Sequence, residues 1–139
     1  MNNCFPAYQS ELSSPQSLLK ALIVDDEDDM HYLLPNILKQ RNIISITAGS
    51  IKEAKEVLKQ HPGIFLIFLD NRLPDGQGYE YIQQFREISG AVIIMITAYD
   101  TSYDKKMAKD YGADYFIGKP FTKDTILEIV DHILQSPAI

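Results

Sequence analysis

Three aspartates, a threonine and a lysine lie close behind short apolar runs of the sequence. Asp25 and Asp26 follow the first run, Asp70 the third, Thr97 the fourth and Lys119 the fifth. Carboxylates that are brought together repel one another unless a cation joins them, and aspartate oxygens with open positions for water suit Mg²⁺. A hydroxyl and an ammonium group are suited to hold the oxygens of a phosphoryl group. If these residues meet, they would place a phosphoryl group on a carboxylate by positioning and charge neutralisation.

The elements that must position these residues alternate between apolar runs and helical patterns, five times between Leu18 and Gln135. Strands separated by helices run parallel, because each crossover returns the chain to the same edge of the sheet. We therefore predict an α/β fold in which five helices cover a five-stranded parallel sheet. The predicted strands are 21–24, 43–47, 64–69, 91–96 and 113–117, and the predicted helices are about 28–40, from 50 onward, 78–88, 100–111 and 123–135.

The composition of the strands predicts their order. The first, third and fourth runs are continuously apolar, as expected for strands that are covered on both faces. The second is diluted by Ser45 and Thr47 and the fifth by Asp114 and Tyr115, so these two should be the edges. This fits the doubly wound, flavodoxin-like order 2-1-3-4-5, in which the ends of strands one and three are neighbours at the switch point. Asp70 should then face the first two aspartates.

Two local signals concern the helices. Ser50 and Glu53 have the spacing of a capping box, in which the Ser50 hydroxyl accepts from the Glu53 N–H and the Glu53 carboxylate reaches back to the Ser50 N–H. Pro35 lies well inside the first predicted helix, where it should kink the helix.

The composition also restricts the class of protein. The chain has 139 residues, 45% of them apolar, which is enough for one domain with a core. A net charge of −6 disfavours nucleic acid or an anionic membrane surface as a partner, and a single cysteine, Cys4, excludes a disulfide framework or a multi-cysteine zinc site. No apolar run is long enough to span a membrane, and no secretory signal is visible. We expect a cytoplasmic domain over 18–136, a flexible leader over 1–17 and a short tail over 137–139.

Each site residue also has a purely structural explanation. The first two aspartates fit a solvated acidic turn that the helix dipole favours, and Asp70 fits a turn before Pro74-Asp75-Gly76. Thr97 fits a strand end or cap, and Lys119 fits an ordinary surface lysine. Their joint occurrence at strand ends in a five-unit pattern favours the functional interpretation. Three histidines lie on separate predicted helices or their ends without metal-binding spacing, and we expect them at the surface: His31, His61 and His132.

Four stretches in this order resemble the receiver domain of two-component response regulators over about residues 20–135. They are Leu22-Ile-Val-Asp-Asp-Glu27, Leu69-Asp-Asn-Arg-Leu-Pro-Asp-Gly76 with Gly78 after it, Ile96-Thr-Ala98 and Gly118-Lys-Pro-Phe121. The resemblance implies transfer of a phosphoryl group from the phosphohistidine of a histidine kinase to an aspartate, followed by hydrolysis. This is self-phosphorylation and autodephosphorylation rather than turnover of a separate substrate.

The resemblance also implies a role for each residue of the site. Asp70 would be the acceptor, while Asp25, Asp26, Asp70 and the backbone carbonyl of Arg72 would hold Mg²⁺, with Mn²⁺ as an alternative. Thr97 and Lys119 would bind the phosphoryl oxygens, and the Lys119–Pro120 peptide bond would be cis. Phe116, three residues before Lys119, would be the aromatic that turns inward when Thr97 moves toward the phosphate, although an ordinary core or edge phenylalanine is the competing explanation.

The partners implied by the resemblance are a sensor histidine kinase or phosphotransfer protein and an output partner or domain. The output partner would dock on the face formed by the fourth helix, fifth strand and fifth helix, and the resemblance also allows a homodimer that forms on phosphorylation. Neither direct nucleic-acid binding nor a membrane is expected. Three residues depart from the usual family pattern and bear on the lifetime of the phosphorylated form: Asn71, Arg72 and Tyr99.

Two other functions stay open. A phosphatase of the haloacid-dehalogenase type would have a second aspartate two residues after its nucleophile, where this chain has Arg72. A receiver-like docking module that is never phosphorylated would not need the complete set of site residues, but only a chemical test excludes it.

Overall fold

The computed structural model describes residues 19–98 and 101–135. The predictions for the leader, for Cys4, for Tyr99 and for the tail lie outside the described residues. The elements in chain order are β1 (Leu19–Val24), α1 (Asp28–Lys39), β2 (Ile43–Ala48), α2 (Ile51–Gln60), β3 (Ile64–Leu69), β4 (Arg72–Leu73), β5 (Gly76–Gln77), the 3₁₀ helix η2 (Gly78–Tyr81), α3 (Ile82–Ser89), β6 (Val92–Thr97), α4 (Ser102–Asp110), β7 (Tyr115–Gly118) and α5 (Lys123–Gln135).

The five long strands form one parallel sheet in the order β2-β1-β3-β6-β7. Since β6 and β7 are the fourth and fifth of these strands along the chain, this is the predicted order 2-1-3-4-5. The edge strands are β2 and β7, the second and fifth of the sheet along the chain, as predicted. In the register of the sheet, Val24 at the end of β1 is paired with Leu69 at the end of β3.

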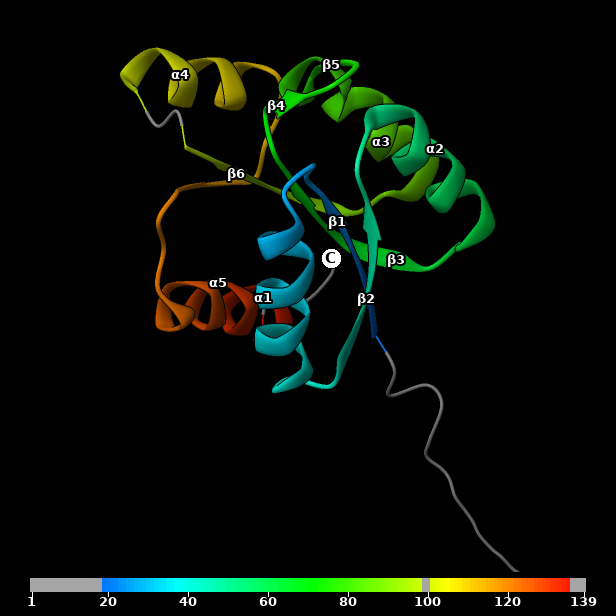
Figure 1. The fold of residues 1–139 in the computed structure, drawn as a ribbon, viewed down its shortest axis with the longest axis vertical. Coiled ribbons are helices and arrows are strands. Elements are labelled where there is room, and N and C mark those ends of the chain that lie inside the picture. Colours follow the sequence, from blue (N-terminus) through cyan, green and yellow to red (C-terminus); the bar gives the residue numbers. More distant parts are fainter. Residues whose placement is uncertain (1–18, 99–100, 136–139) are drawn as a thin grey trace, which may run out of the picture.

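Helices cover both faces of the sheet, with α1 and α5 on one face and α2 and α3 on the other (Figure 1). Successive strand side chains point to opposite faces, so Ala21 and Ile23 of β1 pack with α1 and α5, whereas Leu22 and Val24 pack with α2 and α3. Helix α4 contributes one buried residue, Ala108, to the second of these faces.

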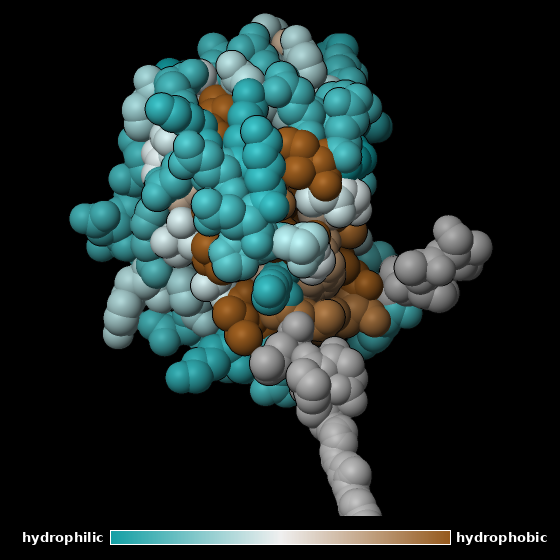
Figure 2. All heavy atoms as spheres, turned by 90° about the vertical axis from the view of Figure 1, so that its right-hand side faces the viewer, coloured by the Kyte–Doolittle hydropathy of each residue, from teal (hydrophilic) through white to brown (hydrophobic). Residues whose placement is uncertain are grey.

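Figure 2 shows the side of the molecule that lies to the right in Figure 1. Hydrophilic side chains cover most of its upper part, and apolar atoms gather toward its lower end. Ile44 of the edge strand β2 is an exposed large hydrophobic residue, with 44% of its surface accessible.

The local predictions for the helices were partly wrong. The Ser50 hydroxyl accepts from the Glu53 N–H at 3.1 Å, as predicted, but the Glu53 carboxylate accepts from the Gly49 N–H at 2.6 Å and not from Ser50. Helix α1 includes Pro35 without ending there, and the predicted kink stays a prediction. The predicted helix 78–88 begins as the 3₁₀ turn η2 before α3 starts at Ile82.

A short antiparallel hairpin, β4–β5, was not predicted at all. It follows Asp70 and ends at η2. Two hydrogen bonds connect the hairpin to the start of α2, because the Asp75 carboxylate accepts from the Ile51 N–H at 2.9 Å and from the Lys52 N–H at 3.0 Å.

Candidate functional site

The carboxyl ends of β1 and β3 bring the three aspartates together, as the strand order predicts. The Asp25 N–H donates to the Ala48 carbonyl at 3.0 Å and the Asp70 N–H donates to the Val24 carbonyl at 2.9 Å, so both residues continue the hydrogen-bonding of the sheet past the strand ends. Asp25, Asp26 and Asp70 each offer a carboxylate oxygen within 4.8 Å of the others. Asp25 and Asp70 are buried, whereas Asp26 is exposed.

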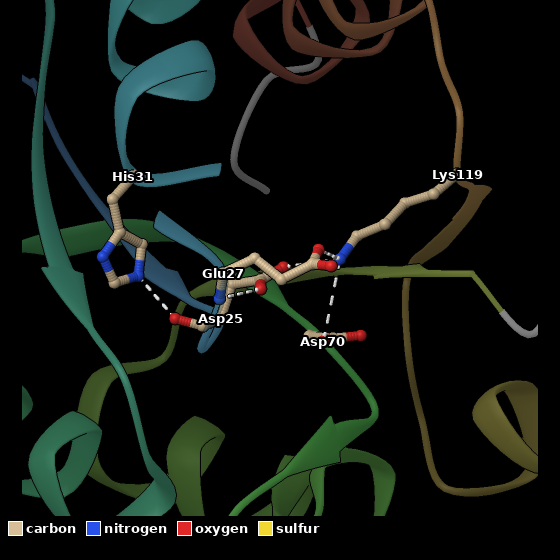
Figure 3. A network of polar contacts seen from close by, with 5 residues as sticks. All are labelled: Asp25, Glu27, His31, Asp70 and Lys119. Carbon is tan, nitrogen blue, oxygen red and sulfur yellow. Dashed lines mark hydrogen bonds and ion pairs between the residues drawn. The ribbon is translucent and has the colours of Figure 1, made fainter. Parts of the chain in front are cut away.

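Lys119 reaches the same pocket from the end of β7 (Figure 3). Its Nζ lies 2.8 Å from Asp25 Oδ2 and 3.7 Å from Asp70 Oδ2. A third carboxylate, that of Glu27, lies 2.7 Å from the same Nζ. The Lys119–Pro120 peptide bond is cis, as the family resemblance implies.

Burial and charge together set the proton affinity of the acceptor candidate. Burial and the neighbouring Asp25 carboxylate raise the pKa of Asp70 to about 6, against the opposing effects of Lys119 and of the backbone N–H groups of Asn71 and Arg72. Burial disfavours the charge of Lys119, but the hydrogen bonds to Asp25 and Glu27 and the charges of Asp70 and Asp25 together raise the pKa of Lys119 above its ordinary value. The pocket therefore holds more negative charge than its one ammonium group neutralises, as expected for a cation site.

Thr97 is the last residue of β6 and is 1% exposed. It is paired with Gly118 in the sheet, and its carbonyl accepts from the Lys119 N–H at 2.8 Å, so Thr97 and Lys119 lie at the same sheet edge. Phe116 is paired with Met95 and is partly buried against the core that β1 and β3 share with α2 and α3.

The residues directly after Asp70 have different environments. Asn71 is buried, and its Oδ1 accepts from the Tyr79 N–H at 3.2 Å while its carbonyl accepts from the Gly78 N–H at 2.7 Å. Arg72 is exposed, and its backbone N–H contacts the Asp70 carboxylate. The two hydrogen bonds of Asn71 therefore join the residues before the β4–β5 hairpin to those after it.

Sequence reasoning missed two residues that contact the site. Glu27 was recognised only as part of the acidic run, and nothing in the run indicates which carboxylate faces Lys119. His31 was expected at the surface, but it is half-buried and its Nε2 contacts the Asp25 carbonyl oxygen. His61 is also half-buried, and His132 is exposed as expected. The contact of His31 depends on how the first turn of α1 folds back on the end of β1, for which the sequence carries no signal.

Relatives of this chain occur among curated proteins. The transcriptional regulatory protein YxdJ of Bacillus subtilis is 35% identical over 109 residues, which cover 78% of this chain and 47% of that protein. The response regulator protein PilR of Pseudomonas aeruginosa is 37% identical over 84% of this chain and 26% of its own length, so this chain spans half or less of either protein. The chemotaxis protein CheY of Halobacterium salinarum is 33% identical over 84% of this chain and 98% of its own length.

Solved structures share the fold. A two-component response regulator from Clostridium difficile superposes with a TM-score of 0.79 at 26% identity, covering 84% of this chain and 96% of the other. A CheY-like receiver domain protein from Methanospirillum hungatei gives a TM-score of 0.78 at 27% identity, covering 85% and 94%. Residues 21–131 match the family described as the response regulator receiver domain. With this match, the parallel sheet and the acidic pocket at its carboxyl edge, the chain belongs to the receiver-domain family of two-component response regulators.

Proposed function

We propose that Asp70 accepts a phosphoryl group from the phosphohistidine of a sensor histidine kinase or phosphotransfer protein and later loses it to water. The observation that carries this proposal is the placement of a buried carboxylate 3.7 Å from the Lys119 ammonium group, at a sheet edge that it shares with Asp25 and Thr97. Membership of the receiver-domain family supports the same assignment.

The reaction needs little from the protein besides position and charge. A bond forms between an Asp70 carboxylate oxygen and phosphorus while the bond from phosphorus to the donor imidazole breaks, and the imidazole keeps the electron pair. The Lys119 ammonium and the Thr97 hydroxyl would hold phosphoryl oxygens as their charge develops. In hydrolysis, water attacks the phosphorus, inorganic phosphate leaves and the Asp70 carboxylate is restored.

The donor set of the pocket fits a small divalent cation. Three carboxylates with oxygens within 4.8 Å of one another, one of them with a raised pKa, form the oxygen-rich and negatively charged site that Mg²⁺ prefers, and Mn²⁺ accepts similar ligands. Asp25, Asp26 and Asp70 would hold the cation, and we propose the Arg72 backbone carbonyl as a further ligand. When bound, the cation neutralises carboxylate and phosphoryl charge.

The output of the domain would be read on the face formed by α4, β7 and α5. Ala108 is the single buried residue of α4, so few contacts hold this helix in place. Tyr103 of α4 is 64% exposed, Tyr111 directly after α4 is 41% exposed, and Leu134 of α5 is 39% exposed. Phosphorylation would bias Thr97 and Phe116 toward an inward arrangement and so alter this face for an output partner or a second copy of the chain.

Signalling is favoured over catalytic turnover. The residue two positions after Asp70 is an exposed arginine, and arginine cannot serve as the acid or base of an aspartyl phosphatase. We also propose a cytoplasmic location, where a kinase would meet the domain. None of the helices in residues 19–98 and 101–135 is long and apolar enough to cross a bilayer.

Incubation with acetyl phosphate and Mg²⁺, followed by intact-protein mass spectrometry, tests the proposal. A single phosphoryl adduct on the wild type that is absent from Asp70→Asn supports Asp70 as the acceptor. Absence of the adduct from both folded proteins would instead favour a docking module. Steady hydrolysis of unrelated phosphate esters would favour the phosphatase.

A further inference from the structure

We propose that Glu27 holds the Lys119 ammonium group in the unphosphorylated domain and competes with the arriving phosphoryl group for it. Glu27 would thus be a positioning residue that restrains phosphorylation of Asp70. This inference rests on the proposed function, because it takes Lys119 as the residue that binds phosphoryl oxygens.

The contacts of Lys119 show where its ammonium group is held. Nζ lies 2.7 Å from Glu27 Oε1 and 2.8 Å from Asp25 Oδ2, whereas Asp70 Oδ2 is 3.7 Å away (Figure 3). An ammonium group has three protons, and two of them are directed to Glu27 and Asp25. The Asp70 carboxylate lies beyond hydrogen-bond distance, so a phosphoryl group on Asp70 that draws the ammonium group toward itself weakens at least one of these two bonds.

Exposure indicates which of the two bonds would be exchanged. The side chain of Asp25 is 4% exposed, and its Oδ1 is also fixed by the Glu27 N–H at 2.9 Å. The side chain of Glu27 is 60% exposed. A pair with such an exposed carboxylate is weak, because water replaces it at little cost. Glu27 is therefore the partner that leaves when a phosphoryl oxygen takes its place.

Among residues 19–98 and 101–135, the Glu27 side chain makes no other hydrogen bond that competes with this role. Glu27 is the N-cap residue of α1, but its side chain makes no capping hydrogen bond. It also lies outside the group of carboxylates whose oxygens gather within 4.8 Å, which consists of Asp25, Asp26 and Asp70. Glu27 therefore acts on Lys119 and not on the cation site.

The charge of Glu27 acts in the same direction as its contact. A phosphoryl group adds a charge of about −1.5 to −2 near neutral pH. A carboxylate that shares Lys119 with this group repels it and reduces the positive charge that is available to it. Replacing Glu27 with glutamine removes the charge and keeps the length of the side chain, so the phosphorylated state should become more favourable.

The experiment compares the full chain with Glu27→Gln and Glu27→Ala, using Asp29→Asn as the matched control. Asp29 is exposed in the first turn of the same helix, so this control removes one negative charge without removing a contact to Lys119. Beryllofluoride, which stands in for the phosphoryl group, is titrated at saturating Mg²⁺ with calorimetric detection. Mg²⁺ binding is titrated separately, and adduct formation from acetyl phosphate is timed by intact mass.

We expect both Glu27 variants to bind beryllofluoride about two- to fivefold more tightly than the wild type, the range for an exposed ion pair. Adduct formation should accelerate by a similar factor, with Asp29→Asn close to the wild type. Glu27 variants that match the control or bind beryllofluoride more weakly would overturn the inference. A Mg²⁺ affinity that falls tenfold in both Glu27 variants would also overturn it, because Glu27 would then be a metal ligand. If the wild type binds no beryllofluoride, the proposed function is wrong, and this inference, which rests on it, is wrong as well.

Discussion

The backbone of Gly78 lies directly against the carbonyl of Asp70. A Cβ atom at position 78 would lie 2.3 Å from the Asp70 carbonyl oxygen and 3.0 Å from Leu69 Cγ, which is closer than atoms can approach without movement of the chain. The Gly78 N–H donates to the Asn71 carbonyl at 2.7 Å, so the turn that carries the β4–β5 hairpin closes directly beside Asp70. The absence of a side chain at Gly78 therefore allows this close approach to the Asp70 backbone.

Gly78→Ala should impair both the fold and the site. Because the clash is with backbone and not with a flexible side chain, the Asp70 peptide must shift, at a cost in the range of about 1–3 kcal/mol for overpacking. We expect a lower free energy of unfolding in urea and slower adduct formation from acetyl phosphate. Gly49→Ala is the control, because its Cβ would have its nearest neighbour at an ordinary 3.6 Å. Equal behaviour of the two variants would contradict the proposed contact.

Asn71, which the family resemblance marks as a departure from the usual pattern, is buried, and its side-chain amide has a structural role. Its Oδ1 accepts from the buried Tyr79 N–H. Asn71→Leu would leave that N–H without this acceptor, which costs about 1–3 kcal/mol. Urea unfolding followed by circular dichroism should show this loss. Unchanged stability would mean that the Tyr79 N–H finds another partner.

Asp75 connects the hairpin to α2 through the two N–H groups at the start of that helix. These hydrogen bonds, first the one from Ile51, hold the pKa of Asp75 below its ordinary value. Asp75→Ala should lower stability by about 1 kcal/mol, the usual effect of losing a helix cap. A carboxylate with a lowered pKa stabilises the fold above its unfolded pKa and stops doing so as pH falls through the folded value. The difference between the variant and the wild type should therefore be constant near neutral pH and shrink below about pH 4.

The features that the sequence predicted correctly depend on repetition along the chain. The order of the five strands follows from three continuously apolar runs flanked by two diluted ones, and the convergence of Asp25, Asp70 and Lys119 follows from the parallel direction of all strands. The placement of these side chains at one edge of the sheet could therefore be predicted before the fold was known.

The features that were missed depend on single side chains or on very short elements. The strands β4 and β5 have two residues each, which is too short for a periodic pattern. Asp75 looks like an ordinary turn residue, and its capping partner Ile51 is 24 positions away. The Glu53 carboxylate accepts from the Gly49 N–H instead of the Ser50 N–H. These two N–H groups are one peptide group apart, and side-chain spacing in the sequence does not distinguish them.

The raised pKa of Asp70 predicts how stability depends on pH in the absence of a divalent cation. The difference between the ordinary pKa of 3.8 and the folded pKa of about 6 corresponds to a change of at most about 3 kcal/mol in the free energy of unfolding. The folded state prefers the protonated acid, so its stability relative to the unfolded chain is highest below about pH 4 and is lost as pH rises through about 6. Asp70→Asn carries no charge at this position and escapes that loss. It should therefore be more stable than the wild type by about 1–3 kcal/mol at pH 7.5, with the gain disappearing near pH 4.

Urea unfolding between pH 4 and pH 8, with a chelator present, measures this gain, and Asp29→Asn controls for the loss of one negative charge. Adding Mg²⁺ at pH 7.5 should reduce the gain, because a ligand that binds only the folded state stabilises it, and the wild type keeps all three carboxylates. If the stability gain of Asp70→Asn grew toward acid pH, the Asp70 carboxylate would not be the group whose charge destabilises the fold. If Mg²⁺ left the gain unchanged, the charge of Asp70 would still destabilise the fold, but Asp70 would take no part in holding the cation.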